Sequence, residues 1–144
     1  MPTFDSARRT TQGARHYQED AAVIWPEGEA SPSADGARLV AVLADGMGGH
    51  AGGALASRIV CDSFLDVCVN ENGPVRERLL SGLAASNRAI AAKVDENPML
   101  AGMGSTLIGA HFVDGSVEWV SVGDSPLLLY RRGDNPMQDF EDVR

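Results

Sequence analysis

The sequence has few cysteines, and their spacing along a helix does not allow a disulfide between them. Only two of the 144 residues are cysteines, Cys61 and Cys68, and they lie seven positions apart in a helical pattern. At a rise of about 1.5 Å per residue, their backbones are roughly 10 Å apart, which is too far for a disulfide. We therefore expect two free thiols and a cytoplasmic protein.

Long apolar runs and an excess of basic residues are also absent. No stretch approaches the roughly 18 apolar residues that a membrane-spanning helix needs, and residues 1–9 lack the apolar core of a signal peptide. The net charge is −8, whereas binding to nucleic acid phosphates requires a basic surface. We therefore expect no membrane and no nucleic acid among the partners.

What remains is the composition of an ordinary globular domain, with 44% hydrophobic and 22% charged residues. The length suits one domain with a core, and we expect a single domain over residues 1–144 with an irregular tail at 131–144. The order of strands, two adjacent helices and a β-meander favours an α+β fold with mainly antiparallel sheets. The predicted elements are strands at 16–25 and 39–44, helices at 51–70 and 74–97, and strands at 105–113, 116–122 and 127–130.

The segment at residues 45–50, Asp-Gly-Met-Gly-Gly-His, directly follows the apolar strand at 39–44. It places a carboxylate, a flexible glycine turn and an imidazole at one strand end. Such a turn can present an oxygen ligand to a metal or bind a phosphate.

A nucleotide site is one alternative, because Gly46, Gly48 and Ala51 satisfy the G-x-G-x-x-A pattern. That pattern also requires a second parallel strand ending in an acidic residue about 20 positions later, where this sequence predicts helix. A P-loop is excluded because no Gly-Lys-Ser/Thr follows the glycines. A metal site is the better interpretation.

Two further carboxylates, Glu19 and Asp20, lie just upstream, and Arg15 precedes Glu19 by four positions. If the strand at 16–25 pairs beside the strand at 39–44 with matching ends, Asp20 and Asp45 converge. Neighbouring carboxylates repel each other, and a bound cation removes that penalty. Arg15 would then be placed to bind an anionic group of a substrate.

Four motifs occur in order along the chain: Arg15-x-x-x-Glu19-Asp20, the segment 42–50, Gly-Ser-Thr at 104–106, and Val-Gly-Asp-Ser at 122–125. Together they resemble the metal-dependent PPM (type 2C) serine/threonine protein phosphatases, particularly the bacterial ones. The resemblance implies the N-terminal part of a four-layer α-β-β-α sandwich. It also implies hydrolysis of phosphoserine and phosphothreonine in proteins by a metal-activated water.

The resemblance also assigns roles to individual residues. Asp45 would bridge two Mn²⁺ or Mg²⁺ ions, the Gly46 carbonyl would bind one of them, and Glu19 and Asp20 would act largely through metal-bound waters. The implied catalytic residues are Arg15, which binds the substrate phosphate, and His50, the general acid. The Gly-Ser-Thr and Gly-Asp-Ser motifs would be structural.

Complete domains of this family are longer and carry two more metal-binding aspartates after the Gly-Asp-Ser motif. Asp134-Asn135 resembles the last of these motifs superficially, but we interpret it as a turn. We therefore expect an incomplete second metal site, and a partner that is either a complementing C-terminal half or a second copy. The alternative function is a non-catalytic binding or regulatory module that keeps the phosphatase half-fold.

Some of these residues also have simple structural interpretations. Arg15 could be a surface arginine, and His50 could cap or flank the following helix. We expect structural roles for His16 and His111, and we interpret Asp124 as a turn residue that binds nearby backbone.

Overall fold

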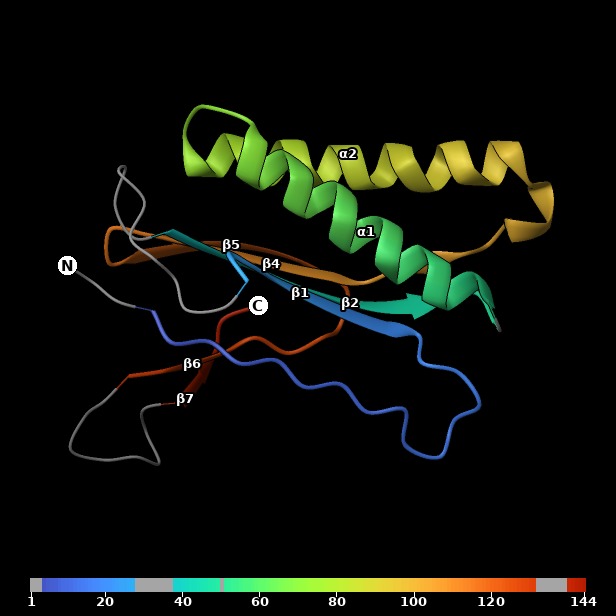
Figure 1. The fold of residues 1–144 in the computed structure, drawn as a ribbon, viewed down its shortest axis with the longest axis horizontal. Helices are drawn as coiled ribbons and strands as arrows, with labels where there is room; N and C mark the ends of the chain where they lie inside the picture. Colours follow the sequence, from blue (N-terminus) through green and yellow to red (C-terminus); the bar gives the residue numbers. More distant parts are fainter. Residues whose placement is uncertain (1–3, 28–37, 50, 132–139) are drawn as a thin grey trace.

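Two helices cover one face of an antiparallel sheet, and extended segments lie along the other face (Figure 1). The computed structural model describes residues 4–27, 38–49, 51–131 and 140–144. Its helices are α1 (Ala51–Asn70), α2 (Val75–Glu96) and the short 3-10 helix η1 (Pro98–Leu100). Its strands are β1 (Asp20–Trp25), β2 (Arg38–Met47), β3 (Gly104–Ser105), β4 (Leu107–Val113), β5 (Ser116–Val122), β6 (Leu128–Tyr130) and β7 (Phe140–Asp142).

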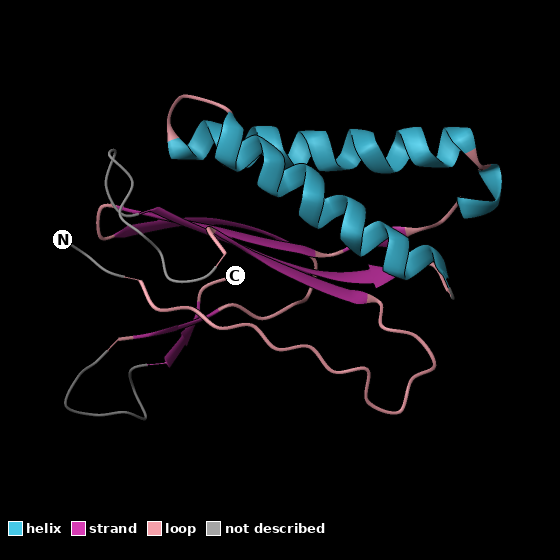
Figure 2. Cartoon of the chain, viewed as in Figure 1, coloured by secondary structure: helices cyan, strands magenta, loops and turns pink. Residues whose placement is uncertain are grey.

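The sheet has the strand order β1-β2-β4-β5, with β3 also paired to β2, and every pairing is antiparallel. Strand β2 is therefore central. Its alternate residues Val40, Val42 and Ala44 face the helices and are buried, as the two-residue period of a strand requires. The expected α+β class with antiparallel sheets is confirmed (Figure 2).

The core lies between the sheet and the two helices. Phe64 of α1 is fully buried, and it lies against Gly82 of α2 and Gly109 of β4. The absence of a side chain at these two glycines makes room for the ring, so that both helices approach the sheet closely. Phe64 and Cys68 both belong to this core, so α1 buries one apolar face.

The hairpin between β4 and β5 has a two-residue turn at Asp114-Gly115. Val113 pairs with Ser116, and Asp114 and Gly115 both have positive φ angles, 50° and 77°. Positive φ at both central residues is the geometry that Asp-Gly favours in such turns.

Three expectations need correction. Helix α2 begins at Val75, so Pro74 is its N-cap residue and not its first helical residue. The predicted strand at 105–113 is divided into β3 and β4, with an interruption at Thr106. The tail is not irregular throughout, because β7 pairs with β6. The expected turn at Asp134-Asn135 lies outside the described residues.

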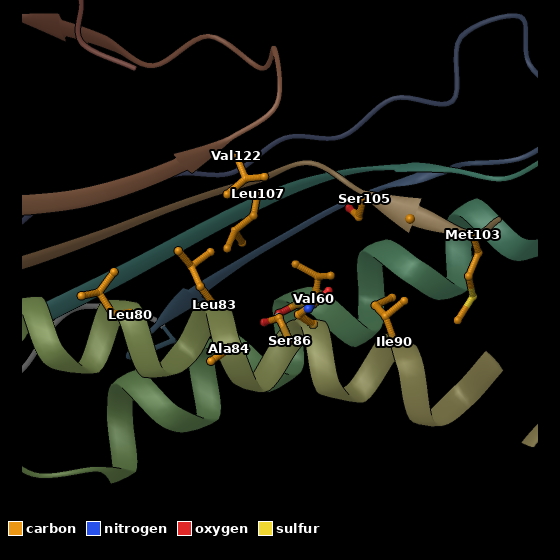
Figure 3. Close-up of a pocket in the computed structure, with 12 residues that line it drawn as sticks. Val60, Leu80, Leu83, Ala84, Ser86, Ile90, Met103, Ser105, Leu107 and Val122 are labelled. Carbon is orange, nitrogen blue, oxygen red and sulfur yellow. The ribbon is translucent and has the colours of Figure 1, made fainter. Parts of the chain in front are cut away.

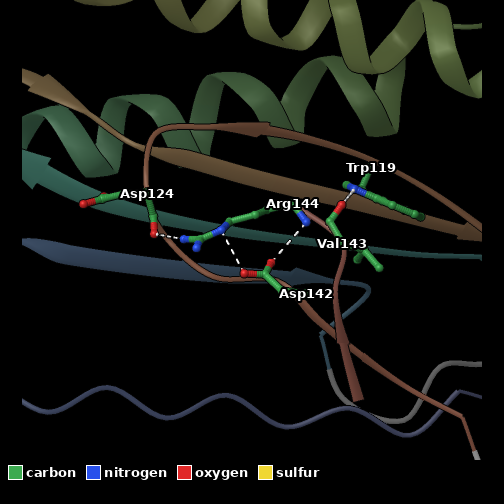
Figure 4. Close-up of polar contacts among 5 residues, drawn as sticks. All are labelled: Trp119, Asp124, Asp142, Val143 and Arg144. Atoms are coloured by element: carbon green, nitrogen blue, oxygen red, sulfur yellow. Dashed lines mark hydrogen bonds and ion pairs between the residues drawn. The ribbon is translucent and has the colours of Figure 1, made fainter. Parts of the chain in front are cut away.

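The chain end returns to the sheet through specific contacts (Figure 4). The indole Nε1 of Trp119 donates a hydrogen bond of 2.8 Å to the Val143 carbonyl. Arg144 forms an ion pair of 2.9 Å with Asp142 and donates to the backbone carbonyl of Asp124. These bonds hold the end of the chain beside the turn that follows β5.

Both cysteines are free and buried, as expected from their spacing. Burial raises the pKa of Cys61 to about 12 and that of Cys68 to about 11, so both thiols stay protonated at neutral pH. None of the helices in the described ranges is long and apolar enough to cross a membrane.

Candidate active site

Asp20 and Asp45 lie directly opposite each other where β1 begins and β2 nears its end. The register of the two strands pairs Asp20 with Asp45, and Ala21 with Ala44. The convergence that the sequence predicted for these two carboxylates is therefore confirmed. Asp45 lies within β2, which continues through Met47, and not in the glycine turn that follows.

The electrostatic environment raises the pKa of Asp45 above its usual value. Desolvation of the carboxyl group is the largest cause, followed by the negative charge of Asp20 and a hydrogen bond with it. The positive charge of Arg15 opposes the shift, and Asp124 adds to it. Because a bound divalent cation would relieve the repulsion between these acidic groups, the arrangement favours cation binding.

A close approach of helix α1 fixes the backbone next to Asp45. A Cβ atom added to Gly46 would lie 1.9 Å from the carbonyl oxygen of Gly53, so no larger residue fits without displacing the helix. The Gly46 N–H donates a 3.0 Å hydrogen bond to the Glu19 carbonyl. The Glu19 carboxyl group in turn lies against Gly53 in the first turn of α1, where the helix dipole stabilises a negative charge.

Arg15 lies at the entrance to this group of residues. Its guanidinium is 3.8 Å from the Glu19 carboxylate, and its side chain is 74% exposed, so it can reach a ligand from solvent. A cleft of about 340 Å³ is lined by Arg15, His16, Tyr17, Glu19 and Gly49. The cleft connects Arg15 with the glycine turn, although its lining does not include Asp45.

The described residues do not by themselves form a complete metal-binding site. Among them, no group of three or more His, Cys, Asp and Glu side chains is arranged to hold a metal ion. Hard divalent cations prefer six or more oxygen ligands, and the facing carboxylates of Asp20 and Asp45 supply only some of them. Of the site residues expected from the sequence, the fold brings together Arg15, Glu19, Asp20, Asp45 and Gly46. His50 lies outside the described residues.

Two residues of the Gly-Ser-Thr and Gly-Asp-Ser motifs, which were expected to be structural, interact with Asp45 in ways that the sequence did not predict. Thr106 Oγ1 accepts a 3.0 Å hydrogen bond from the backbone N–H of Asp45, and the charge of Asp124 adds to the rise in the pKa of Asp45 that desolvation and Asp20 cause. A topological argument could have located both. Because neighbouring strands are antiparallel, one end of the sheet brings together the end of β2, the start of β4 and the end of β5.

A separate apolar groove of about 570 Å³ lies between α2 and the sheet (Figure 3). Leu80 and Val122 line it and are about half exposed, with exposed fractions of 52% and 49%. The other lining residues are Val60, Leu83, Ala84, Ser86, Asn87, Ile90, Met103, Gly104, Ser105 and Leu107. The groove leaves an apolar surface open next to β5.

Comparison with known proteins gives a consistent family match. The family model for protein phosphatase 2C matches residues 27–142. The serine/threonine protein phosphatase PstP of Mycobacterium tuberculosis is 43% identical over 100 residues, which are 69% of this chain and 19% of that protein. Protein phosphatase PhpP of Streptococcus pneumoniae is 33% identical over 98 residues, or 65% of this chain and 39% of PhpP.

Solved structures agree with these relatives. The catalytic domain of PstP in complex with two manganese ions superposes with a TM-score of 0.71 at 34% identity, covering 90% of this chain and 50% of that one. Stp1 of Staphylococcus aureus superposes with a TM-score of 0.73 at 27% identity, covering 94% and 50%. The chain therefore spans about half of the solved domains that it matches.

Proposed function

Because the chain belongs to the protein phosphatase 2C family, we propose that it contributes one half of a metal-dependent serine/threonine protein phosphatase site. The substrates would be phosphoserine and phosphothreonine residues of proteins, and the proposed location is the cytoplasm. The observation that carries the proposal is the facing pair of Asp20 and Asp45, in which desolvation, followed by the negative charge of Asp20, raises the pKa of Asp45.

In this proposal, Mn²⁺ or Mg²⁺ would be held, directly or through water, by Asp45, the Gly46 carbonyl, Asp20 and Glu19. When bound, the metal would act as a Lewis acid that activates water for attack on phosphorus and neutralises the negative charge of the phosphoryl oxygens. The support for these assignments is that the structure brings the four residues together. The PstP catalytic domain, solved with two manganese ions, supports the metal identity by similarity.

Arg15 is proposed to bind the substrate phosphate, because its exposed guanidinium borders the cleft beside the glycine turn. His50 is proposed as the general acid that protonates the departing serine or threonine oxygen, a role suited to an imidazole near neutral pH. No covalent phosphoenzyme is needed, since water attacks directly.

The remaining oxygen ligands are proposed to come from a complementing C-terminal half. This chain covers only 50% of the PstP catalytic domain, so about as much chain again is present in that relative. The open apolar groove along α2 and β5 is a surface that such a segment could cover. A homo-oligomer is the competing outcome, and light scattering of the isolated chain would reveal it.

Manganese binding and phosphatase activity test the proposed site together. Calorimetry should detect Mn²⁺ binding to the chain, and Asp45→Asn should weaken it by at least about tenfold, because a charged ligand is lost. Asp114→Asn is the matched control, since it removes the same charge at the far end of the β4–β5 hairpin. Hydrolysis of a phosphothreonine peptide, measured with the complementing C-terminal half present, should depend on Mn²⁺ and be lost in Asp45→Asn.

The absence of a three-ligand group in the described part of the chain favours one alternative, a non-catalytic binding or regulatory module. This alternative predicts binding of phosphopeptides without release of phosphate, even with Mn²⁺ present. Two tight manganese sites in the calorimetric titration would contradict it. Activity that survives in Asp45→Asn would contradict the main proposal.

A further inference from the structure

The backbone hydrogen-bond ladder between β2 and the segment that contains β3 and β4 becomes irregular opposite Asp45. Leu43 pairs with Ile108, and Gly46 pairs with Ser105, so the register places Thr106 opposite Asp45. The N–H of Thr106 donates to the Asp45 carbonyl at 2.9 Å, as in a regular antiparallel ladder. The return bond is different, because the Asp45 N–H donates to the Thr106 side-chain Oγ1 at 3.0 Å.

The neighbouring serine engages the backbone groups on the same side. Ser105 Oγ lies 2.8 Å from the Thr106 carbonyl and 3.1 Å from the Asp45 carbonyl. The Thr106 carbonyl, which would accept the Asp45 N–H in a regular ladder, therefore has a hydroxyl donor beside it. The replacement of a backbone acceptor by the Thr106 hydroxyl coincides with the interruption between β3 and β4 at Thr106.

The same threonine hydroxyl also contacts the turn that carries Asp124. Thr106 Oγ1 lies 3.0 Å from Ser125 Oγ. Gly123 lies so close that an added Cβ would be 2.7 Å from Thr106 Cγ2. Thr106 itself is only 5% exposed. The Thr106 side chain is thus held between Asp45 and the turn at 123–125. It connects the strand that carries Asp45 with the turn that carries Asp124.

We propose that Thr106 is a positioning residue for Asp45: its hydroxyl replaces a backbone acceptor and holds Asp45 in register opposite Asp20. With a side chain that cannot accept the bond, the Asp45 N–H would turn to the Thr106 carbonyl, and the ladder would close as a regular one. The Asp45 backbone would then shift relative to β1 and to the turn at 123–125. The consequence for metal binding rests on the proposed function of Asp45.

The test compares Thr106→Val with Thr106→Ser. Valine keeps the buried shape without the hydroxyl, whereas serine keeps the hydroxyl and loses only a methyl group. In the metal-free chain, the amide ¹H–¹⁵N resonance of Asp45 should move in Thr106→Val and return toward its wild-type position in Thr106→Ser. The shift of the Asp45 backbone should weaken Mn²⁺ binding roughly 3- to 10-fold in Thr106→Val, a change of the size that one hydrogen bond contributes, with affinity restored in Thr106→Ser.

An unchanged Asp45 resonance in folded Thr106→Val would overturn the inference, whatever the affinity for Mn²⁺. If the wild-type chain binds no Mn²⁺ through Asp45, the proposed function fails, while the metal-free resonance still decides the role of Thr106. Should Thr106→Val fail to fold, Ser125→Ala becomes the deciding variant, because it removes a partner of the same hydroxyl without changing the strand. An Asp45 resonance that does not respond to Ser125→Ala would then reject the inference.

Discussion

At the scale of single residues, Gly46 shows how closely the candidate site is built against helix α1. The position of its missing Cβ is 1.9 Å from the Gly53 carbonyl oxygen and 2.8 Å from the Glu19 carbonyl oxygen. Both neighbours are backbone atoms, which cannot move aside as a flexible side chain can. A side chain here forces the helix or the strand to shift.

We expect Gly46→Ala to lower the free energy of unfolding by about 1–3 kcal/mol, the range for overpacked interiors. Urea unfolding followed by circular dichroism measures the change. Gly104→Ala is the matched control, because its added Cβ would lie 3.6 Å from Met47 Cγ, an ordinary contact distance. Equal stability losses in the two variants would contradict this account of Gly46.

At the scale of elements, Phe64 joins helix α1 to both α2 and the sheet. A Cβ atom added to Gly109 would lie 2.3 Å from the Phe64 ring, and one added to Gly82 would lie 2.8 Å from it. The ring therefore occupies space that two glycines leave free. The packing of three elements depends on this one arrangement of large and small residues.

We expect Phe64→Ala to cost about 3–5 kcal/mol of stability, because a buried aromatic side chain leaves a cavity. Gly109→Ala should also destabilise the wild-type chain, since its methyl group collides with the ring. In the Phe64→Ala background, the same Gly109→Ala change should cost less or even stabilise. A double-mutant cycle of unfolding free energies measures this coupling, and additive effects would show that the two residues are independent.

At the scale of the whole molecule, His111 lies where both helices meet the sheet. Arg38 of β2 donates a 3.0 Å hydrogen bond to His111 Nε2, and Arg38 and Arg78 both donate to the Cys68 carbonyl near the end of α1. Burial, reinforced by the charges of Arg78 and Arg38, lowers the pKa of His111 from 6.5 to about 4. The folded chain therefore keeps this histidine neutral, and its structural role agrees with the sequence-based expectation.

This shift makes global stability depend on pH. The unfolded chain binds a proton at His111 near pH 6.5, whereas the folded chain does so only near pH 4, so stability falls as the pH drops through this window. Glutamine in His111→Gln cannot titrate but still offers a hydrogen-bond acceptor. We therefore expect the midpoint of urea unfolding to fall less in His111→Gln than in wild type when the pH is lowered from about 7 to about 5. Equal losses in the two proteins would contradict a contribution from His111.

Much of the fold could be predicted from local sequence. Asp114-Gly115 specifies a two-residue turn because both positions need positive φ, and the apolar period of residues 51–70 specifies a helix with one buried face. The short strand β7 was missed, because three residues give too little periodicity and its pairing with β6 is a tertiary contact.

The candidate site divides in the same way. By itself, the sequence determined that a carboxylate lies at the end of a buried strand beside a glycine turn, and matching strand ends were enough to bring Asp20 opposite Asp45. Only the tertiary structure decided that Thr106, 61 positions away, supplies the acceptor for the Asp45 N–H, and that the charge of Asp124 acts on Asp45. The reason is physical: strand propensity is local, whereas a side chain that replaces a backbone acceptor depends on the register of distant strands.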